Sequence, residues 1–183
     1  MNTPHTLLRH PSSPPSPVAS ISASVQIEPH DLVIQYLVRG HLDAVRWPAR
    51  SEGGPADALW QHTCLEAFIA PEGSSAYREF NFSPSGQWAA YRFAGERQRD
   101  STLAPDMPAP LMQLAITPAL FTLDVHLSQA ALPSPSRHFQ LALCAVIEEH
   151  DGRLSYWALQ HPQARPDFHH PAGRSLRLAL PAN

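Results

Sequence analysis

The chain has 183 residues and a formal net charge of −3, and this length suffices for one hydrophobic core of ordinary size. All 13 basic residues are arginines scattered along the sequence, so no basic stripe is present to hold a phosphate backbone, and we expect no nucleic-acid partner. The 20 prolines recur between apolar stretches, where they would interrupt any long helix. The composition therefore favours strands and turns.

Cys64 and Cys144 lie inside apolar stretches, which indicates two buried free thiols rather than a disulfide framework. The sequence has no secretory signal and no apolar run long enough to cross a bilayer, so we expect a soluble cytoplasmic protein without a membrane partner. Residues 1–17 are rich in Pro, Ser and Thr and are predicted to form a flexible lead segment outside the fold. Residues 18–183 then form a single domain.

Short apolar or alternating stretches follow from Ser20 onward, separated by clusters of Pro, Gly, Asp and Ser. Residues 121–128 alternate strictly, which is typical of a strand with one solvated face, whereas residues 139–148 are apolar on both faces and indicate a central strand. About ten strands without an amphipathic helix predict an all-β fold, an antiparallel, jelly-roll-like sandwich with an immunoglobulin-like two-sheet architecture. The predicted strands cover residues 20–28, 32–39, 63–70, 77–83, 87–93, 111–117, 121–128, 139–148, 154–159 and 175–180.

The segment Ser83-Pro84-Ser85-Gly86 has the residue pattern of a type I turn and is predicted to close a hairpin. Pairing Ser83 with Gly86 places Asn81 opposite Trp88, Glu79 opposite Ala90 and Tyr77 opposite Arg92, so that one face is polar with aromatic edges. The other face then collects an apolar set suited to the core, namely Phe80, Phe82, Ala89, Tyr91 and Phe93.

The strand at residues 63–70 turns Leu65, Ala67 and Ile69 toward the core and leaves Glu66 on the opposite side. A carboxylate on a half-buried face loses hydration that only a partner can replace. We therefore expect Glu66 either to pair with Arg92 or Arg78 or to face a wet groove.

Three segments together resemble the DOMON-like sandwiches and, among them, the family 9 carbohydrate-binding modules. They are Trp60 followed after five residues by Glu66, the polar strand Glu79-Phe-Asn-Phe-Ser83, and Asp167-Phe-His-His-Pro-Ala-Gly173 before the last strand. The similarity covers most of residues 20–180. It implies a jelly-roll-like β-sandwich and, in sugar-binding relatives, a terminal sugar held between aromatic rings with Glu, Arg, Asn and Gln bonding its hydroxyls.

Carried over to this sequence, the resemblance makes Trp60 a stacking platform, Glu66 a hydroxyl acceptor, Asn81 and Ser83 the polar pair of the second strand, and Phe168 the nearest equivalent of a second aromatic wall. Where the family has a sugar-binding Arg on the second strand, this chain has Asn81. The candidate ligand-binding site also includes their neighbours, namely Glu79, Trp88, Arg92 and His169. An aromatic face buries the C–H side of a pyranose while carboxylates and amides pair with its hydroxyls. We predict a non-catalytic module that binds a carbohydrate or polyol in a shallow groove, without cofactor or metal.

Two alternatives remain open at this stage. Other DOMON relatives carry haem, and the 11 histidines include His161, His169 and His170, although adjacent histidines in an extended chain point apart and no metal-ligand spacing is present. The chain is alternatively an interaction module that assists an enzyme partner.

An enzymatic role is not expected from this sequence. Glu66 and Glu79 are a candidate hydrolytic pair, but Arg92 on the same predicted face would keep a catalytic acid ionised. The serines of the turn lack a nucleophile elbow, and neither cysteine stands beside an evident base.

Overall fold

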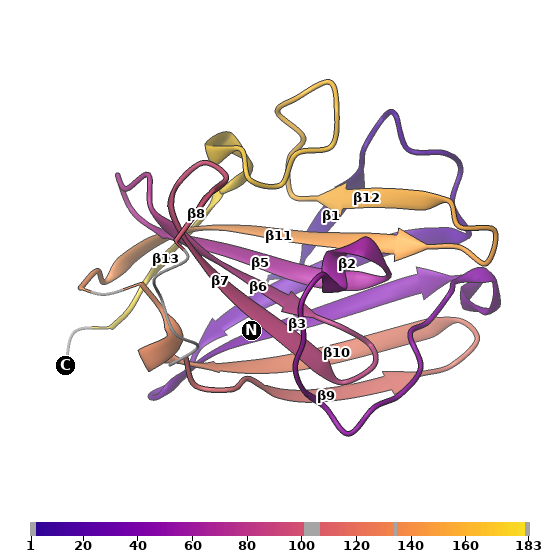
Figure 1. Cartoon of the computed structure of the whole chain (residues 1–183), viewed down its shortest axis with the longest axis horizontal. Helices are drawn as coiled ribbons and strands as arrows, with labels where there is room; N and C mark the ends of the chain where they lie inside the picture. The colour runs from indigo at the N-terminus through magenta and orange to yellow at the C-terminus, as the bar shows by residue number, and fades with distance from the viewer. Residues whose placement is uncertain (1–2, 101–106, 134, 182–183) are drawn as a thin grey trace.

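The computed structural model describes residues 3–100, 107–133 and 135–181, and nearly all of its regular structure is strand (Figure 1). Each of the ten predicted strands is present, which confirms these predictions. They are β2 (Val18–Ile27), β3 (Asp31–Gly40), β5 (Cys64–Pro71), β6 (Tyr77–Phe82), β7 (Gln87–Gly95), β9 (Leu111–Ile116), β10 (Leu120–Ser128), β11 (His138–Glu148), β12 (Leu154–Ala158) and β13 (Leu176–Ala179).

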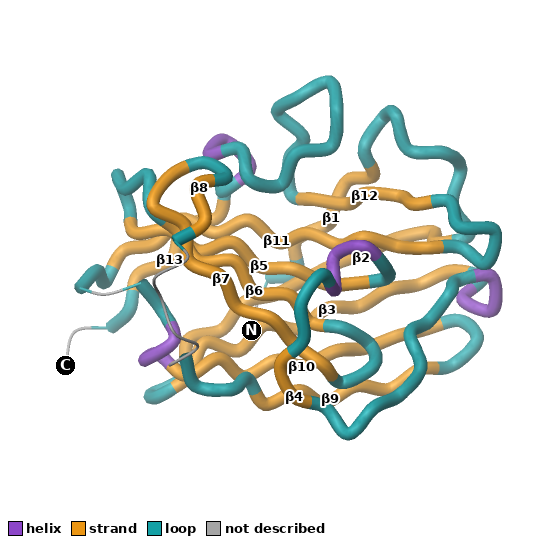
Figure 2. The backbone as a smooth tube through the Cα atoms, viewed as in Figure 1, coloured by secondary structure: helices purple, strands orange, loops and turns teal. Residues whose placement is uncertain are grey.

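Three further strands were not predicted, namely β1 (His5–Arg9), β4 (Gly54–Pro55) and β8 (Gln98–Arg99). Figure 2 shows how little helix interrupts the strands. The helical pieces are the 3-10 turns η1 (Leu42–Ala44), η2 (Leu59–Gln61), η3 (Gln129–Ala131) and η4 (Pro171–Gly173). In the part of the chain that the structure describes, no helix has the length and apolar character needed to cross a membrane.

Within the described residues all thirteen strands belong to one hydrogen-bonded sheet, in the order β4-β7-β6-β5-β11-β12-β1-β2-β3-β10-β9, with β13 on β11 and β8 on β7. The β4–β7 pair is parallel, so the sheet is mixed. We call β7, β6, β5, β11 and β12 the β5 half, and β2, β3, β10 and β9 the β3 half. β1 joins the two halves, because Leu8 and Arg9 pair with β12 while residues 5–7 pair with β2.

The sheet curls so that its two halves face each other across one apolar core (Figure 1). Tyr36 of β3 spans this core and donates its hydroxyl to the backbone oxygen of Glu66 at 2.8 Å. Burial of the facing side chains is the main favourable term in holding the halves together. The core includes Ile21, Ile34, Val38, Leu65, Ala67, Ile69, Phe80, Phe82, Leu123, Val125, Leu141 and Leu143.

The outer faces of the two halves differ. On β10 of the β3 half, buried residues alternate with partly exposed ones, as predicted. On β5 and β11 both faces are buried, which confirms β11 as a central strand. A second apolar cluster covers the outer face of the β5 half, and it contains Phe68, Tyr77, Tyr91, Phe93, Ala142 and Cys144, with Leu59 and Phe168 packed against it. This covered outer face carries the candidate site.

The interpretation of residues 1–17 as a segment outside the fold is wrong for β1. Leu7 is 1% exposed and belongs to the core, and the backbone of β1 is paired on both sides. The strand is only five residues long and Pro-rich sequence flanks it, so its short apolar stretch gives no periodic signal.

The predicted register of the β6–β7 hairpin is wrong by one residue. The Ser83 amide donates to the Gln87 carbonyl at 2.9 Å and the Gly86 amide to the Ser83 carbonyl at 3.0 Å, so Ser83 pairs with Gln87. Gly86 has a φ of +97°, the left-handed conformation that typically follows a type I turn in a three-residue hairpin loop. This extra loop residue shifts every pair of the ladder.

The observed ladder places Tyr77 opposite Phe93, Glu79 opposite Tyr91 and Asn81 opposite Ala89. Tyr91 and Phe93 therefore share the outer face with Glu79, instead of joining the core as predicted. The rings of Phe80 and Phe82 do turn into the core, 1% and 0% exposed, as predicted.

Candidate functional site

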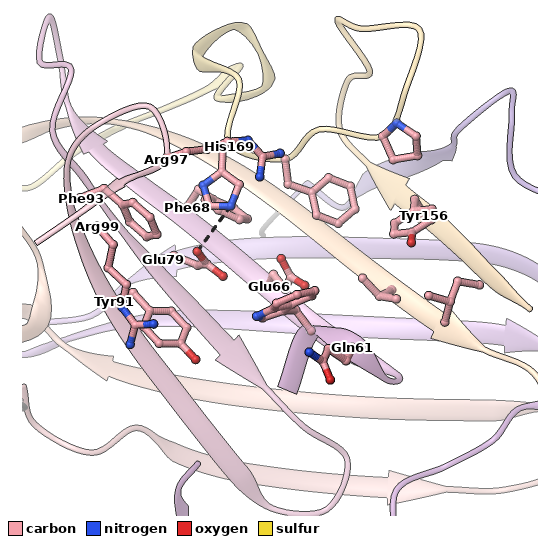
Figure 3. A pocket seen from close by; sticks show the side chains of 15 residues that line it. Gln61, Glu66, Phe68, Glu79, Tyr91, Phe93, Arg97, Arg99, Tyr156 and His169 are labelled. Atoms are coloured by element: carbon pink, nitrogen blue, oxygen red, sulfur yellow. Dashed lines mark ion pairs between the residues drawn. The ribbon is translucent and has the colours of Figure 1, made fainter. Parts of the chain in front are cut away.

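A cavity of about 510 Å³ opens on the covered outer face of the β5 half (Figure 3). Strands β5, β6, β7, β11 and β12 line the cavity, together with the β7–β8 hairpin, η2 and the segment between β12 and η4. Its lining residues are Trp60, Gln61, Glu66, Phe68, Glu79, Tyr91, Phe93, Arg97, Arg99, Val146, Leu154, Tyr156, Pro166, Phe168 and His169.

Two carboxyl groups lie at the floor of this cavity. Glu66 of β5 is 2% exposed and Glu79 of β6 is 4% exposed. Glu66 pairs with Asn81 and Phe68 with Glu79 in the β5–β6 ladder, so the two carboxyls are diagonal neighbours on one face. Asn81 donates from Nδ2 to Glu79 Oε1 at 2.7 Å. Glu66 lines the cavity, and its Oε1 atom is buried without any hydrogen-bond partner in the described residues.

Burial keeps protons on both carboxyls at higher pH than usual. Desolvation raises the pKa of Glu66 well above its ordinary value, and the nearby charge of Glu79 raises it further. Desolvation also raises the pKa of Glu79 to about 7, against the opposing effects of the Asn81 hydrogen bond and of Arg99 and Arg97. Near neutral pH the pair therefore offers both an O–H donor and a carboxylate acceptor.

His169 forms the polar wall above Glu79. The Tyr77 hydroxyl accepts from the backbone amide of Arg97 at 3.1 Å and shares a hydrogen bond of 2.7 Å with His169 Nδ1. The other ring nitrogen, Nε2, lies 3.8 Å from Glu79 Oε2 (Figure 3). Burial lowers the pKa of His169 to about 4, so the ring is neutral at physiological pH.

Aromatic rings form most of the apolar surface of the cavity. Trp60 stands at the rim on η2 and is 49% exposed, an unusual position for so large a ring. Tyr156 and Phe168, which also line the cavity, contact each other edge to face, with ring centroids 6.1 Å apart. Phe68 and Phe93 pack against the His169 ring at centroid distances of 5.2 Å and 5.1 Å. The site is thus amphipathic, with apolar walls and a polar floor.

Two arginines reach the rim from the β7–β8 hairpin. Arg97 binds Asp167 at 2.8 Å, and Arg99 lies 4.1 Å from the Tyr91 ring centroid and 4.0 Å from Asp57. Each guanidinium therefore already has an aspartate partner.

The backbone is strained on both sides of the cavity. Among the described residues, Ala58 and Arg97 are the only ones other than glycine with positive φ, at 58° and 55°. Ala58 precedes Trp60, and its amide donates to Asp57 Oδ1 at 2.9 Å. The Tyr91 hydroxyl also donates to Asp57, which holds the η2 loop against β7. Strain of this kind is concentrated at ligand-binding sites because the surrounding structure must enforce it.

The structure brings together five of the nine predicted site residues, namely Trp60, Glu66, Glu79, Phe168 and His169. Asn81 lies directly behind them, fully buried, and positions Glu79.

Three predicted site residues lie away from this cavity. Ser83 stays in the turn, where its Oγ accepts from the Ser85 hydroxyl at 2.9 Å. Trp88 lines a smaller cavity of about 320 Å³ at the edge of β7. Arg92 pairs across the ladder with Arg78, on the core side of the hairpin. The prediction that Arg92 shares a face with the carboxyls is therefore wrong, and neither arginine forms an ion pair with Glu66 in the described residues.

Seven of the polar and aromatic lining residues were not predicted, and one of them, Phe68, lies two residues after Glu66 on β5. The correct hairpin register would have found Tyr91 and Phe93, because both are in phase with Glu79. Gln61 adjoins Trp60, so the sequence did point to its loop. Arg97 and Arg99 reach the cavity from the β7–β8 hairpin, which was not predicted, and Tyr156 reaches it from β12 through the pairing of β12 with β11.

The candidate haem or metal ligands lie in different surroundings. His161 Nε2 lies 2.7 Å from the Leu8 carbonyl oxygen, whereas His169 bonds Tyr77. In the described residues, the group with ligand atoms close enough for a metal ion is Glu28, Asp31 and His126, in the β3 half and apart from the cavity. Cys64 and Cys144 are free and buried, as predicted.

Neither a known protein family nor a curated protein matches the sequence. Solved structures do match. A candidate carbohydrate-binding protein from Bacteroides uniformis is similar with a TM-score of 0.72 and 18% identity, over 99% of this chain and 86% of that one. A family 9 carbohydrate-binding module from Caldicellulosiruptor kristjanssonii, solved with glucose, is similar with a TM-score of 0.57 and 8% identity, over 93% and 81% of the two chains.

The same module solved with cellotriose gives a TM-score of 0.58 and 8% identity, over 92% of this chain and 81% of that one. At such low identities the similarity concerns the fold. The chain therefore has a β-rich fold like that of carbohydrate-binding modules, in agreement with the resemblance seen in the sequence.

Proposed function

We propose that the chain is a non-catalytic carbohydrate-binding module and that its ligand occupies the cavity between Trp60 and His169. The observation that carries this proposal is the unpartnered Oε1 atom of Glu66, buried at the floor of an aromatic-walled cavity. A buried polar atom without a partner carries a desolvation penalty, which a hydrogen bond from a ligand hydroxyl to the Glu66 carboxyl, after its rotation, would offset. The solved sugar complexes of similarly folded modules support the same assignment.

The chemistry of the cavity suits a sugar. A pyranose has apolar C–H faces that pack against aromatic rings, and hydroxyls that both donate and accept. Trp60 and the Tyr156–Phe168 pair supply the rings, while Glu66, Glu79 and His169 Nε2 supply the polar partners. The cavity volume of about 510 Å³ lies in the usual range of small-molecule sites.

Several finer features belong to the same proposal. We assign the chain to the DOMON-like class and its architecture to the antiparallel, jelly-roll-like sandwiches. We place the protein in the cytoplasm, where an enzyme partner would act on the sugar that it binds. The absence of catalysis is supported by the similarly folded binding modules rather than by Arg92, which does not reach the carboxyls.

The proposal is tested by titrating a panel of mono- and disaccharides into the protein, with calorimetry and tryptophan fluorescence as readouts. We expect saturable binding that is weakened by Glu66→Gln and unaffected by Glu72→Gln, a matched control at an exposed carboxylate outside the cavity. Heat and fluorescence that stay flat across the whole panel would reject a sugar-binding function. Release of nitrophenol from aryl glycosides, abolished by Glu66→Gln, would reject its non-catalytic character.

A further inference from the structure

The two floor carboxyls of the cavity lack a permanently charged partner. Among the described residues, no arginine lies within 4.0 Å of Glu66 or Glu79, and the nearest basic group is the neutral ring of His169, 3.8 Å from Glu79. The arginines that line the cavity are engaged elsewhere, Arg97 with Asp167 and Arg99 with Asp57. Arg99 and Arg97 act on Glu79 only from beyond ion-pair distance, so the protein compensates only in part the negative charge that the floor can develop.

The charged groups around the cavity have both signs. Four acids, Glu66, Glu79, Asp57 and Asp167, face or flank the cavity, together with Arg97, Arg99 and Arg174, which donates to the His169 carbonyl at 3.3 Å. Two neighbouring carboxyls in a dry site cannot easily both ionise, because each charge disfavours the other. A cationic group placed between them would stabilise both ionised forms more strongly than a neutral hydroxyl does.

The rings around the floor favour the same kind of ligand. Five such rings line the cavity, of which Phe68, Phe93 and Tyr91 are buried, Tyr156 is half-buried and Trp60 is exposed. The faces of aromatic rings carry negative electrostatic potential and attract cations, most strongly where water is excluded. Arg99 above the Tyr91 ring shows this interaction at the rim.

Building on the proposed carbohydrate-binding function, we propose that the preferred ligand is an amino sugar whose protonated amine binds between the carboxyl groups of Glu66 and Glu79. The amine then donates to the unpartnered Glu66 Oε1 and to Glu79 Oε2, while Asn81 keeps Glu79 Oε1. The sugar ring lies against Trp60 or the Tyr156–Phe168 pair, with its hydroxyls toward the rim.

The protonation of the free site gives this proposal a distinct signature. Because burial raises the pKa of both carboxyls, Glu66 and Glu79 remain at least partly protonated near pH 7 in the protein without ligand. An arriving ammonium group displaces that proton into solvent and leaves a carboxylate–ammonium pair. Binding of a neutral sugar provides no such drive for proton release.

The experiment is calorimetric titration at pH 7 with glucosamine, galactosamine and mannosamine, each compared with its uncharged parent sugar and its N-acetyl derivative. Two buffers of different ionisation enthalpy report proton release. We expect at least one amine to bind at least tenfold more tightly than its parent and its N-acetyl form, with release of protons. Glu66→Gln should abolish this preference, whereas Glu72→Gln should retain it.

The outcomes separate this inference from the proposed function. Equal or weaker binding of all three amines relative to their parents would overturn the amino-sugar assignment and leave the carbohydrate-binding function intact. No binding of any sugar would overturn both. If Glu66→Gln fails to fold by circular dichroism, Glu79→Gln replaces it, and the comparison of ligands on the unaltered protein is decisive in either case.

Discussion

The outer faces of β10 and β5 show how one curled sheet serves two purposes. On β10, Thr122, Asp124 and His126 are partly exposed and meet solvent. On β5, Glu66 and Phe68 occupy the equivalent outer positions but are buried, 2% and 1% exposed, beneath the η2 loop and the segment before η4. The inner faces of both strands join the same core.

This difference identifies the functional side of the fold. A strand with one solvated face needs polar side chains there only for solubility. A carboxyl on a strand whose two faces are both covered has no such purpose, because burial costs it hydration. Polar groups that persist on a doubly covered strand, such as Glu66, Glu79 and Asn81, therefore indicate a binding site rather than a surface.

The largest expected effect concerns the core side of β6. Phe80→Ala should destabilise the protein by about 3–5 kcal/mol, because it removes a fully buried ring and leaves a cavity. Urea unfolding followed by tryptophan fluorescence measures the loss. A cost below about 1 kcal/mol would mean that the inner face of β6 is not part of the main core.

The second largest effect on stability concerns the outer face of β6, which carries the site. Glu79 has a folded pKa of about 7, raised from 4.5, so it stabilises the fold below pH 4.5 and loses that contribution as pH rises through 7. Glu79→Gln keeps the Asn81 hydrogen bond but does not ionise. The stability of this variant relative to the original protein should therefore rise by about 2 kcal/mol between pH 5 and pH 8.

Thermal unfolding of the two proteins at several pH values checks this difference. His169 makes an opposite contribution to stability: with a pKa of about 4 it stabilises the fold above pH 6.5 and does so less as pH falls through 4. Because both proteins contain His169, this contribution cancels in the difference between their stabilities. Arg97, Arg99 and Asp57 also act on Glu79, but both proteins contain them. A constant difference across the pH range would contradict the buried, partly protonated state of Glu79.

A smaller effect separates binding from stability at the rim. Trp60→Ala should weaken sugar binding about tenfold, equivalent to about 1.4 kcal/mol, because the stacking surface is lost. Trp60 is half exposed, so the free energy of unfolding should change by no more than about 0.5 kcal/mol. Unchanged affinity in the titration would remove Trp60 from the site.

The smallest effect is expected on the solvated face. Asp124→Ala removes an exposed hydrogen bond from Gln35, 2.7 Å long, and should change stability by no more than about 0.5 kcal/mol without altering sugar binding. Chemical unfolding together with the same titration provides the check. A loss comparable to that of Phe80→Ala would show that the two halves of the sheet do not differ as described.

Much of this fold could be predicted from the sequence, because ten strands carry either period-two alternation or a fully apolar run bounded by turn residues. The shared outer face of Glu66, Glu79 and Asn81 followed from the same alternation. Register was less accessible, since a single left-handed residue, Gly86, determines whether the loop has two or three residues. Because of that one residue, Tyr91 and Phe93 lie in the site and Arg92 lies outside it, contrary to the prediction.

The rest of the site depends on contacts between segments far apart in the sequence. Tyr77 connects Arg97 to His169, 72 positions later in the sequence, and Tyr156 of β12 contacts Phe168 in the segment that follows β12. No local pattern encodes such approaches. The resemblance to known modules compensated in part, because it pointed to Phe168 and His169 as well as Trp60.

The short strand β1 has a practical consequence for handling the protein. It fills the seam between the two halves, with β12 on one side and β2 on the other. A shortened chain that starts at Val18 would expose the backbone edges of both neighbours, and exposed edges recruit strands from other molecules. Strand β1 thus protects these edges against self-association, and deletions should leave His5–Arg9 in place.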